Sequence, residues 1–260
     1  MDEPARIHAF QRWVADTVAE RSEPWRFGTH LADDTFPTKY DANFLRVERS
    51  VGDATAAELH AIADERQAGL RHREFVVEDD AEGARLAPGF VALGYDADRL
   101  VSMVLRREPD RAAPPDVRAT EADLPTVHPM MVAAGIEDIP GLSRADALLL
   151  ADYRTVVRDR VGARFFAGWV DEQVAGGCEL YLHEGVGQIE NVDTLAAYRN
   201  RGVARAYLGA AIDAARADGA DLIFLVADDA DWPKHLYAKL GFDELGFHRQ
   251  FTKVPRPAAA

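Results

Sequence analysis

Cysteine is almost absent from the 260-residue sequence, which contains Cys178 alone. A single cysteine forms neither an intrachain disulfide nor a cysteine-rich zinc site, which excludes disulfide-stapled domains and zinc modules. Long apolar runs are absent too, because none approaches the roughly 18 residues that a membrane helix needs. The acidic start, Met1-Asp2-Glu3-Pro4, lacks the basic region of a signal peptide. These absences predict a soluble, cytoplasmic protein.

Positive charge is scarce. The sequence has 30 Lys and Arg against 44 Asp and Glu, a net charge of −14. Such a chain is repelled by phosphate backbones and by anionic lipid, so we expect neither nucleic acid nor a membrane as partner. The 48% of hydrophobic and 28% of charged residues are typical of a folded globular protein.

Residues 107–116 divide the sequence. They contain three prolines and five charged residues, a composition that neither a helix nor a central strand tolerates. We therefore expect one domain over residues 1–106, a linker over 107–116 and a second domain over 117–255.

The second domain reads as a mixture of helices and strands. Short turns join three strand-like runs, which predicts an antiparallel meander. An apolar run at 222–226 predicts a buried strand with parallel pairing. The expected strands lie at 117–120, 164–170, 174–182, 188–195 and 222–226, with two more between 242 and 254, and the expected helices begin near 121, 143, 203 and 231. This order predicts an α+β fold with a mixed, largely antiparallel sheet flanked by helices.

The two halves repeat one another at an offset of 147 residues. Residues 89–95 are similar to 236–242, and the strand-like run at 75–77 falls on 222–224. Any two strand–helix segments share some likeness, but a full set of elements aligns at this one offset. Tyr237 corresponds to Phe90, which has no hydroxyl, and the loop at 199–204 corresponds to 52–57, which has no arginine.

The loop Arg199-x-x-Gly202-x-Ala204 joins a strand to an amphipathic helix. The free N–H groups of a helix start attract anions, and glycine lets the backbone approach them closely. Three arginines, at 199, 201 and 205, concentrate positive charge there. The loop is therefore a candidate pyrophosphate site, although an ordinary helix start can contain the same residues.

This order of strand, glycine-bearing loop, helix, apolar strand and a helix ending in residues 236–242 resembles the GNAT superfamily of acyl-CoA N-acyltransferases. The resemblance covers about residues 117–254 and implies a GNAT N-acetyltransferase domain. With the repeat, it implies a tandem arrangement whose first copy is degenerate and truncated, since too few residues precede Phe44 for a complete one.

The resemblance also implies roles for individual residues. Tyr237 would lie near the sulfur of acetyl-CoA, the co-substrate, and Ala230 stands where the family often has asparagine. The residues implied to bind the coenzyme are Val192, Asp193 and Thr194 on the strand and Asn200, Arg201, Gly202, Val203, Ala204 and Arg205 in the loop.

The chemistry of acyl transfer suits these residues. A primary amine must lose a proton to attack a thioester, and the leaving thiolate must gain one. The Tyr237 phenol is the candidate acid. Glu190 is the candidate base, although a solvated or ion-paired strand glutamate would look the same. In a regular strand Asp193 would face away from Glu190, which favours a structural role for Asp193. No metal is expected.

We therefore expect transfer of an acetyl or short acyl group to a small-molecule or peptide amine. The alternatives are a non-catalytic acyl-CoA-sensing module and a binder of another nucleotide. The acceptor site would be walled by residues 134–143 and 245–252, and Glu137 and Asp138 would either attract a cationic amine or lie solvated in a loop. The sequence leaves the oligomeric state open, a homodimer included.

Overall fold

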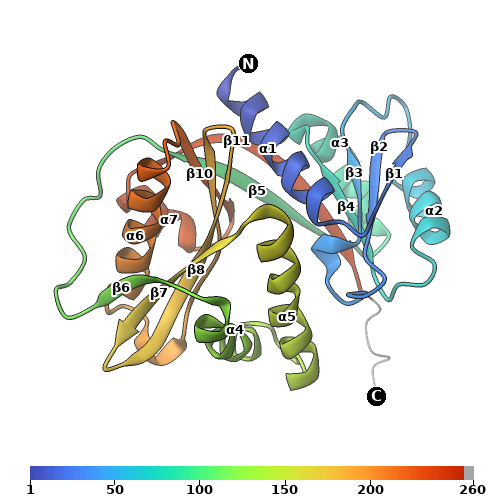
Figure 1. The fold of residues 1–260 in the computed structure, drawn as a ribbon. Coiled ribbons are helices and arrows are strands. Elements are labelled where there is room, and N and C mark those ends of the chain that lie inside the picture. The colour runs from blue at the N-terminus through green and yellow to red at the C-terminus, as the bar shows by residue number, and fades with distance from the viewer. Residues whose placement is uncertain (255–260) are drawn as a thin grey trace. The chain divides into compact units, whose positions relative to one another are not determined.

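A computed structural model describes residues 1–254. They group into two compact units (Figure 1). We call residues 1–14, 103–226 and 233–244 the C-terminal unit, and residues 15–102, 227–232 and 245–254 the N-terminal unit. The units are therefore not continuous in sequence, because the first helix is grouped with the C-terminal unit and the last strand mostly with the N-terminal one. The domain boundaries expected around residues 107–116 stay a prediction, and residue 255 lies outside the described residues.

The C-terminal unit contains most of the elements expected from the sequence. They are α1 (Glu3–Val18), β6 (Arg118–Ala122), α4 (Leu124–Asp138), α5 (Arg144–Val161), β7 (Arg164–Val170), β8 (Gln173–His183), β9 (Val186–Thr194), η2 (Ala196–Tyr198), α6 (Val203–Ala217), β10 (Leu222–Asp228) and α7 (Pro233–Lys239). Residues 107–116 contain neither helix nor strand.

The N-terminal unit repeats the pattern on a smaller scale. Its elements are β1 (Arg21–Trp25), β2 (Gly28–Ala32), η1 (Tyr40–Ala42), β3 (Phe44–Val47), α2 (Ala56–Arg66), β4 (Arg73–Val77) and α3 (Asp80–Ala92). Two long strands, β5 (Asp96–Leu105) and β11 (Phe242–Lys253), contribute residues to both units.

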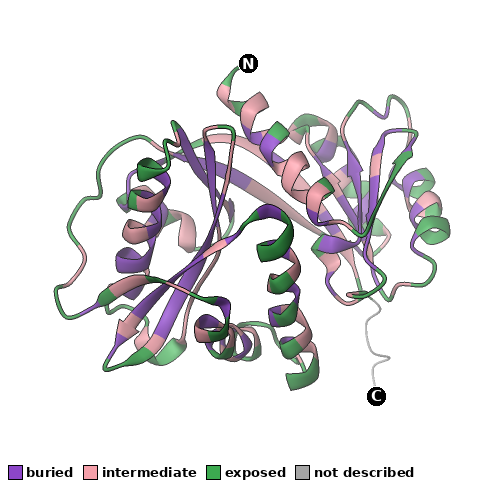
Figure 2. Ribbon diagram, in the orientation of Figure 1, coloured by how far each residue is buried: buried purple, intermediate pink, exposed green. Residues whose placement is uncertain are grey.

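The sheet of the C-terminal unit runs in the order β10-β9-β8-β7-β6. Strands β7, β8 and β9 form the expected antiparallel meander, β6 pairs antiparallel with β7, and β10 pairs parallel with β9. Helix α6 packs on one face of this sheet, and α4, which pairs with α5, packs on the other (Figure 1). The buried side of α6 is the apolar stripe of Val203, Tyr207, Leu208, Ala211, Ile212 and Ala215 (Figure 2). The mixed, largely antiparallel sheet flanked by helices confirms the expected fold class.

In the N-terminal unit, β3 and β4 form the same kind of parallel pair as β9 and β10. The turn after the following helix also repeats, since Gly94 and Gly241 both adopt positive φ, +84° and +100°. Such backbone is nearly free of strain only for glycine. The repeat at an offset of 147 residues therefore persists in the backbone.

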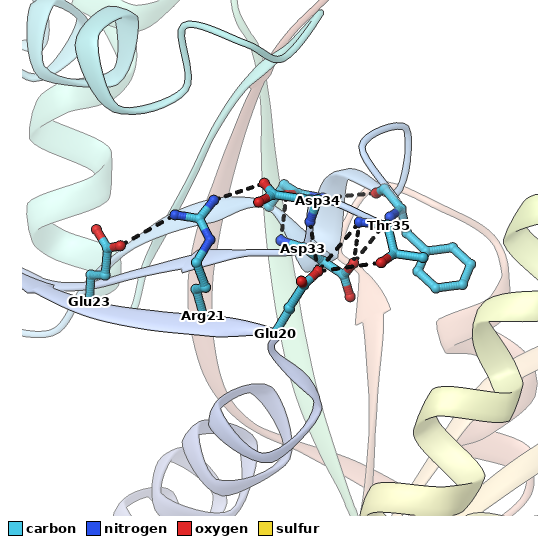
Figure 3. A network of polar contacts seen from close by, with 8 residues as sticks. Glu20, Arg21, Glu23, Asp33, Asp34 and Thr35 are labelled. Carbon is cyan, nitrogen blue, oxygen red and sulfur yellow. Dashed lines mark hydrogen bonds and ion pairs between the residues drawn. The ribbon is translucent and has the colours of Figure 1, made fainter.

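The β1–β2 hairpin carries an exposed polar network at its open end (Figure 3). Arg21 donates to Asp34 at 2.8 Å and to Glu23 at 3.3 Å, while Glu20 accepts from the main-chain N–H of Asp34 at 3.0 Å. The Asp33 carboxylate accepts from the main-chain N–H groups of Thr35 and Phe36. These bonds hold the chain as it leaves β2.

The expectation of two strands after residue 242 is wrong. The chain forms one strand, β11, because Gly246 does not turn it. The second half of β11 pairs antiparallel with β4, from Arg249 with Val77 to Lys253 with Arg73. The last strand of the sequence thus completes the sheet of the N-terminal unit. None of the helices in residues 1–254 is long and apolar enough to span a membrane.

Replacement of Phe251 by alanine tests this arrangement. Phe251 is fully buried in the core of the N-terminal unit and stacks on Phe90 at 4.5 Å. We expect F251A to lower the free energy of unfolding by about 3–5 kcal/mol, measured by urea denaturation. V254A, at a 40% exposed position three residues on, is the control and should change it little. Equal stability of F251A and the wild type would contradict the arrangement.

Candidate active site

The N-terminus of α6 has free main-chain amides. Gly202 is its N-cap residue, with φ +77° and no side-chain hydrogen bond to the helix. A Cβ at Gly202 would lie 2.6 Å from Pro114, so both the backbone and the space require glycine. The first N–H groups of a helix have no intrahelical partner, and here no capping side chain takes their place. They can bind an anion.

The same position of the repeat is closed in the N-terminal unit. At the offset of 147 residues, Gly202 corresponds to Thr55, which is the N-cap of α2. Thr55 accepts from the N–H of Glu58, and the Glu58 carboxylate accepts from the N–H of Thr55. This capping box satisfies the amides of Thr55 and Glu58 and adds a negative charge, which disfavours an anion there.

The arginines of the loop make contacts that the sequence does not reveal. Arg199 donates to the carbonyl of Thr194 at 2.8 Å and pairs with Asp138. Arg205 is buried and pairs with Asp110 at 2.7 Å. Two of the three positive charges expected at the loop are thus compensated by carboxylates. Anion binding would depend on the amides of residues 200–205 rather than on these side chains.

Strands β9 and β10 pair over only part of their length. The parallel register runs from Val186 with Leu222 to Ile189 with Leu225, while β9 continues to Thr194 in pairing with β8. The edge of β9 over residues 190–194 is therefore outside the parallel ladder. Its main-chain groups are candidates to bind a ligand. One is already used, because Tyr207 on α6 donates to the carbonyl of Asp193 at 3.1 Å.

A bulge interrupts β9 along this edge. Gly177 of β8 is opposite Asp193, and Glu179 is opposite Glu190, so three steps on β9 match two on β8. Asn191 within the bulge has φ +51°, which asparagine tolerates better than most residues. Residues two apart on a strand share a face, and so do directly opposed residues. Asp193 and Glu190 therefore point to the same side. The expectation that they face opposite ways is wrong, because β9 is not regular.

Four side chains form a closed ring around the bulge. Arg154 on α5 donates to Asn191 Oδ1 at 2.7 Å, and its Nε lies 3.1 Å from Glu179 Oε1. Asn191 Nδ2 donates to Tyr181 Oη at 3.3 Å, and Tyr181 donates in turn to Glu179. Burial, and then the Glu179 charge, raise the pKa of Tyr181, which stays protonated. The ring ties α5 to both strands and fixes the side chain of Asn191.

Sequence reasoning missed this ring. Its members come from a helix and two strands, and none belongs to a recognisable motif. The signal that could have found it is Glu179, an acidic residue within an apolar strand, because a buried carboxylate requires a partner.

Tyr237 lies on α7 and is 6% exposed. Burial raises the pKa of the Tyr207 phenol, and the nearby Tyr237 contributes to the same rise. Tyr207 in turn shares a hydrogen bond of 3.1 Å with Thr194 Oγ1. The α6 side of β9 therefore carries two phenols, and the α5 side carries the carboxylates.

The remaining candidates have defined contacts. Glu190 accepts from Gln188 Nε2. Glu137 and Asp138 end helix α4 rather than lying in a loop, and Glu137 accepts from the N–H of Ala196 at 2.8 Å. Both carboxylates are exposed and hold the segment that leads to the loop, and attraction of a cationic amine stays a prediction. Cys178 is buried, which raises the pKa of its thiol. No three His, Cys, Asp or Glu side chains within residues 1–254 are grouped as metal ligands.

Comparisons with known proteins find a family model that matches part of the C-terminal half. Residues 137–242 match the model of the Acetyltransferase (GNAT) family. No curated protein matches the chain.

Several solved structures share the fold. A GCN5-related N-acetyltransferase from Kribbella flavida gives a TM-score of 0.65 at 17% identity and covers 99% of this chain and 97% of its own. A conserved protein of unknown function from Staphylococcus epidermidis gives 0.71 at 14% identity, over 90% and 94%. A tandem GNAT protein from the clavulanic acid biosynthesis pathway gives 0.54 at 14% identity, over 82% and 76%. Because the likeness to the first two structures extends over nearly the whole chain, the N-terminal half shares their fold.

Substitutions of Asn191 test the bulge. Glycine adopts positive φ freely, whereas alanine is disfavoured there by about 1–2 kcal/mol. Both remove the amide group, so we expect N191G to be more stable than N191A in urea denaturation. At Gln188, in the regular part of β9, we expect the opposite order: Q188A should be more stable than Q188G, since glycine weakens a strand. The same order of stability at both positions would contradict the bulge.

Proposed function

Because residues 137–242 match the model of the Acetyltransferase (GNAT) family, we propose that this protein transfers an acetyl or short acyl group from acyl-CoA to a primary amine. The observation that carries the proposal is the uncapped N-terminus of α6 next to the free edge of β9. The first would bind a diphosphate and the second the arm that extends from it.

The coenzyme would bind mainly through the backbone. The amides of Asn200, Arg201, Gly202, Val203, Ala204 and Arg205 would hold the pyrophosphate. Residues 192–194 would contact the pantetheine arm and the thioester carbonyl. A fixed main-chain N–H in this edge would stabilise the oxyanion that forms when the amine attacks. The Asp193 carbonyl is not free to accept a hydrogen bond from the pantetheine arm, since Tyr207 donates to it.

Tyr237 would protonate the leaving thiolate. It lies beside Tyr207 on the α6 side of β9, and its counterpart in the N-terminal unit is Phe90, which has no proton to give. A carboxylate of β9 would accept the proton of the amine, and Glu190 is the residue that the family resemblance suggests. The N-terminal unit lacks the phenol and the open amides, so we assign catalysis to the C-terminal unit alone.

The proposed phosphate site is tested by G202A. An alanine Cβ would meet Pro114 and would strain the positive φ of residue 202. We expect the affinity for coenzyme A to fall at least about tenfold, which corresponds to roughly 1.4 kcal/mol, in calorimetric titration. G219A is the control, because Gly219 follows the other end of α6, has φ +82° and has open space around it. Equal affinities of G202A and G219A would contradict the site.

The acid is tested by Y237F. We expect kcat to fall about a hundredfold, while the affinity for coenzyme A stays unchanged, in an assay of free thiol release. Y95F, which removes a buried hydroxyl bonded to His60 in the N-terminal unit, should keep the wild-type rate. Normal turnover by Y237F would refute the assignment. Coenzyme binding without thiol release from any amine would instead identify an acyl-CoA-sensing module.

A further inference from the structure

Five carboxylates lie on or beside the α4/α5 face of β9. Four have partners: Glu179 bonds to Tyr181 and pairs with Arg154, Glu190 accepts from Gln188, Glu137 accepts from the N–H of Ala196, and Asp138 pairs with Arg199. The fifth is Asp193. Its carboxylate makes no hydrogen bond and no ion pair with any residue between 1 and 254.

The surroundings of Asp193 make this unusual. Burial raises the pKa of its carboxyl above the ordinary value. The charges that act on it are Arg154 from α5, Asp138 from α4, Glu179 from β8 and Arg199 from the segment after η2, and the two arginines each have another carboxylate as ion-pair partner. A partly buried carboxylate without a partner is costly unless a cation or a proton binds it.

The position of Asp193 is fixed on both sides. Its carbonyl accepts from Tyr207, and the bulge at Asn191 turns its side chain to the face of Glu179 and Glu190. It lies beyond Ile189, the last residue of β9 in the parallel ladder. This places Asp193 on the free edge where the thioester would lie, with the carboxylate toward α5 and the phenols on the opposite side.

We propose that Asp193 binds the ammonium group of the acceptor and takes its proton before the amine attacks the thioester. The inference rests on the proposed function and names the substrate class, an alkyl primary amine that is cationic at neutral pH. The amine nitrogen forms a bond to the carbonyl carbon, and the bond from that carbon to sulfur breaks. The first proton of the ammonium passes to Asp193 before the attack, and Tyr237 gives its proton to sulfur as the carbon–sulfur bond breaks. The second proton then passes from the nitrogen to the phenolate, so that an amide, free coenzyme A and a neutral Tyr237 result. The Asp193 carboxyl releases its proton to solvent.

Two nucleophiles separate this role from a structural one. n-Butylamine must give up a proton, with a pKa of about 10 like that of lysine, whereas hydroxylamine is neutral at pH 7. With acetyl-CoA and the full chain, we expect D193N to lose about a hundredfold or more in kcat/KM for n-butylamine and only a few-fold for hydroxylamine. E121Q is the control for removal of a carboxylate, because Glu121 on β6 pairs with Arg164 on β7.

The pH profile gives a second readout. A base works only when deprotonated, so the wild-type rate with n-butylamine should fall as the pH drops through the raised pKa of Asp193. D193N should lack this acidic limb and unfold at the same urea concentration as the wild type or a higher one. The inference would be overturned if E190Q lost about a hundredfold in kcat/KM for n-butylamine while D193N kept the wild-type value. Equal losses in kcat/KM of D193N with both nucleophiles would also overturn it. A wild type that releases no thiol with either nucleophile would overturn the proposed function, and the inference with it.

Discussion

The candidate site depends on one helix start that has no side-chain cap. Most helices satisfy their first amides with a neighbouring side chain, and α2 does so with Thr55 and Glu58. Gly202 occupies the corresponding place before α6 and leaves the amides free. The same supersecondary unit therefore caps its helix amides in one half of the chain and leaves them without a side-chain cap in the other. The difference arises from two positions: Thr55 corresponds to Gly202, and Glu58 corresponds to Arg205.

The bulge in β9 is the second constraint. A regular strand would separate Glu190 and Asp193 onto opposite faces and would aim different main-chain groups along the free edge. The ring of Arg154, Glu179, Tyr181 and Asn191 stabilises the irregular backbone. Buried polar networks are costly when one member is missing. The ring therefore makes the shape of the edge depend on α5, a helix far from it in sequence.

Local patterns predicted much of the fold. The start of α5 at Ser143, the stripe of α6 and the parallel strand at Leu222 follow from capping and periodicity, and each is confirmed. The loop before α6 could be singled out as a candidate because Gly202 and its neighbours are contiguous. The single strand β11, the ion pairs of Arg199 and Arg205 and the bulge were not predictable. They depend on β4, α4, the linker and α5, partners that lie between about 25 and 180 residues away in the sequence.

The most direct measurement is an NMR titration of the ¹⁵N-labelled protein with coenzyme A, followed at the amides of both helix starts. The account predicts large shifts at residues 200–205, along with unchanged resonances at residues 55–58, where the capping box holds the amides. Unperturbed amides before α6, or equal shifts at the two helix starts, would contradict it.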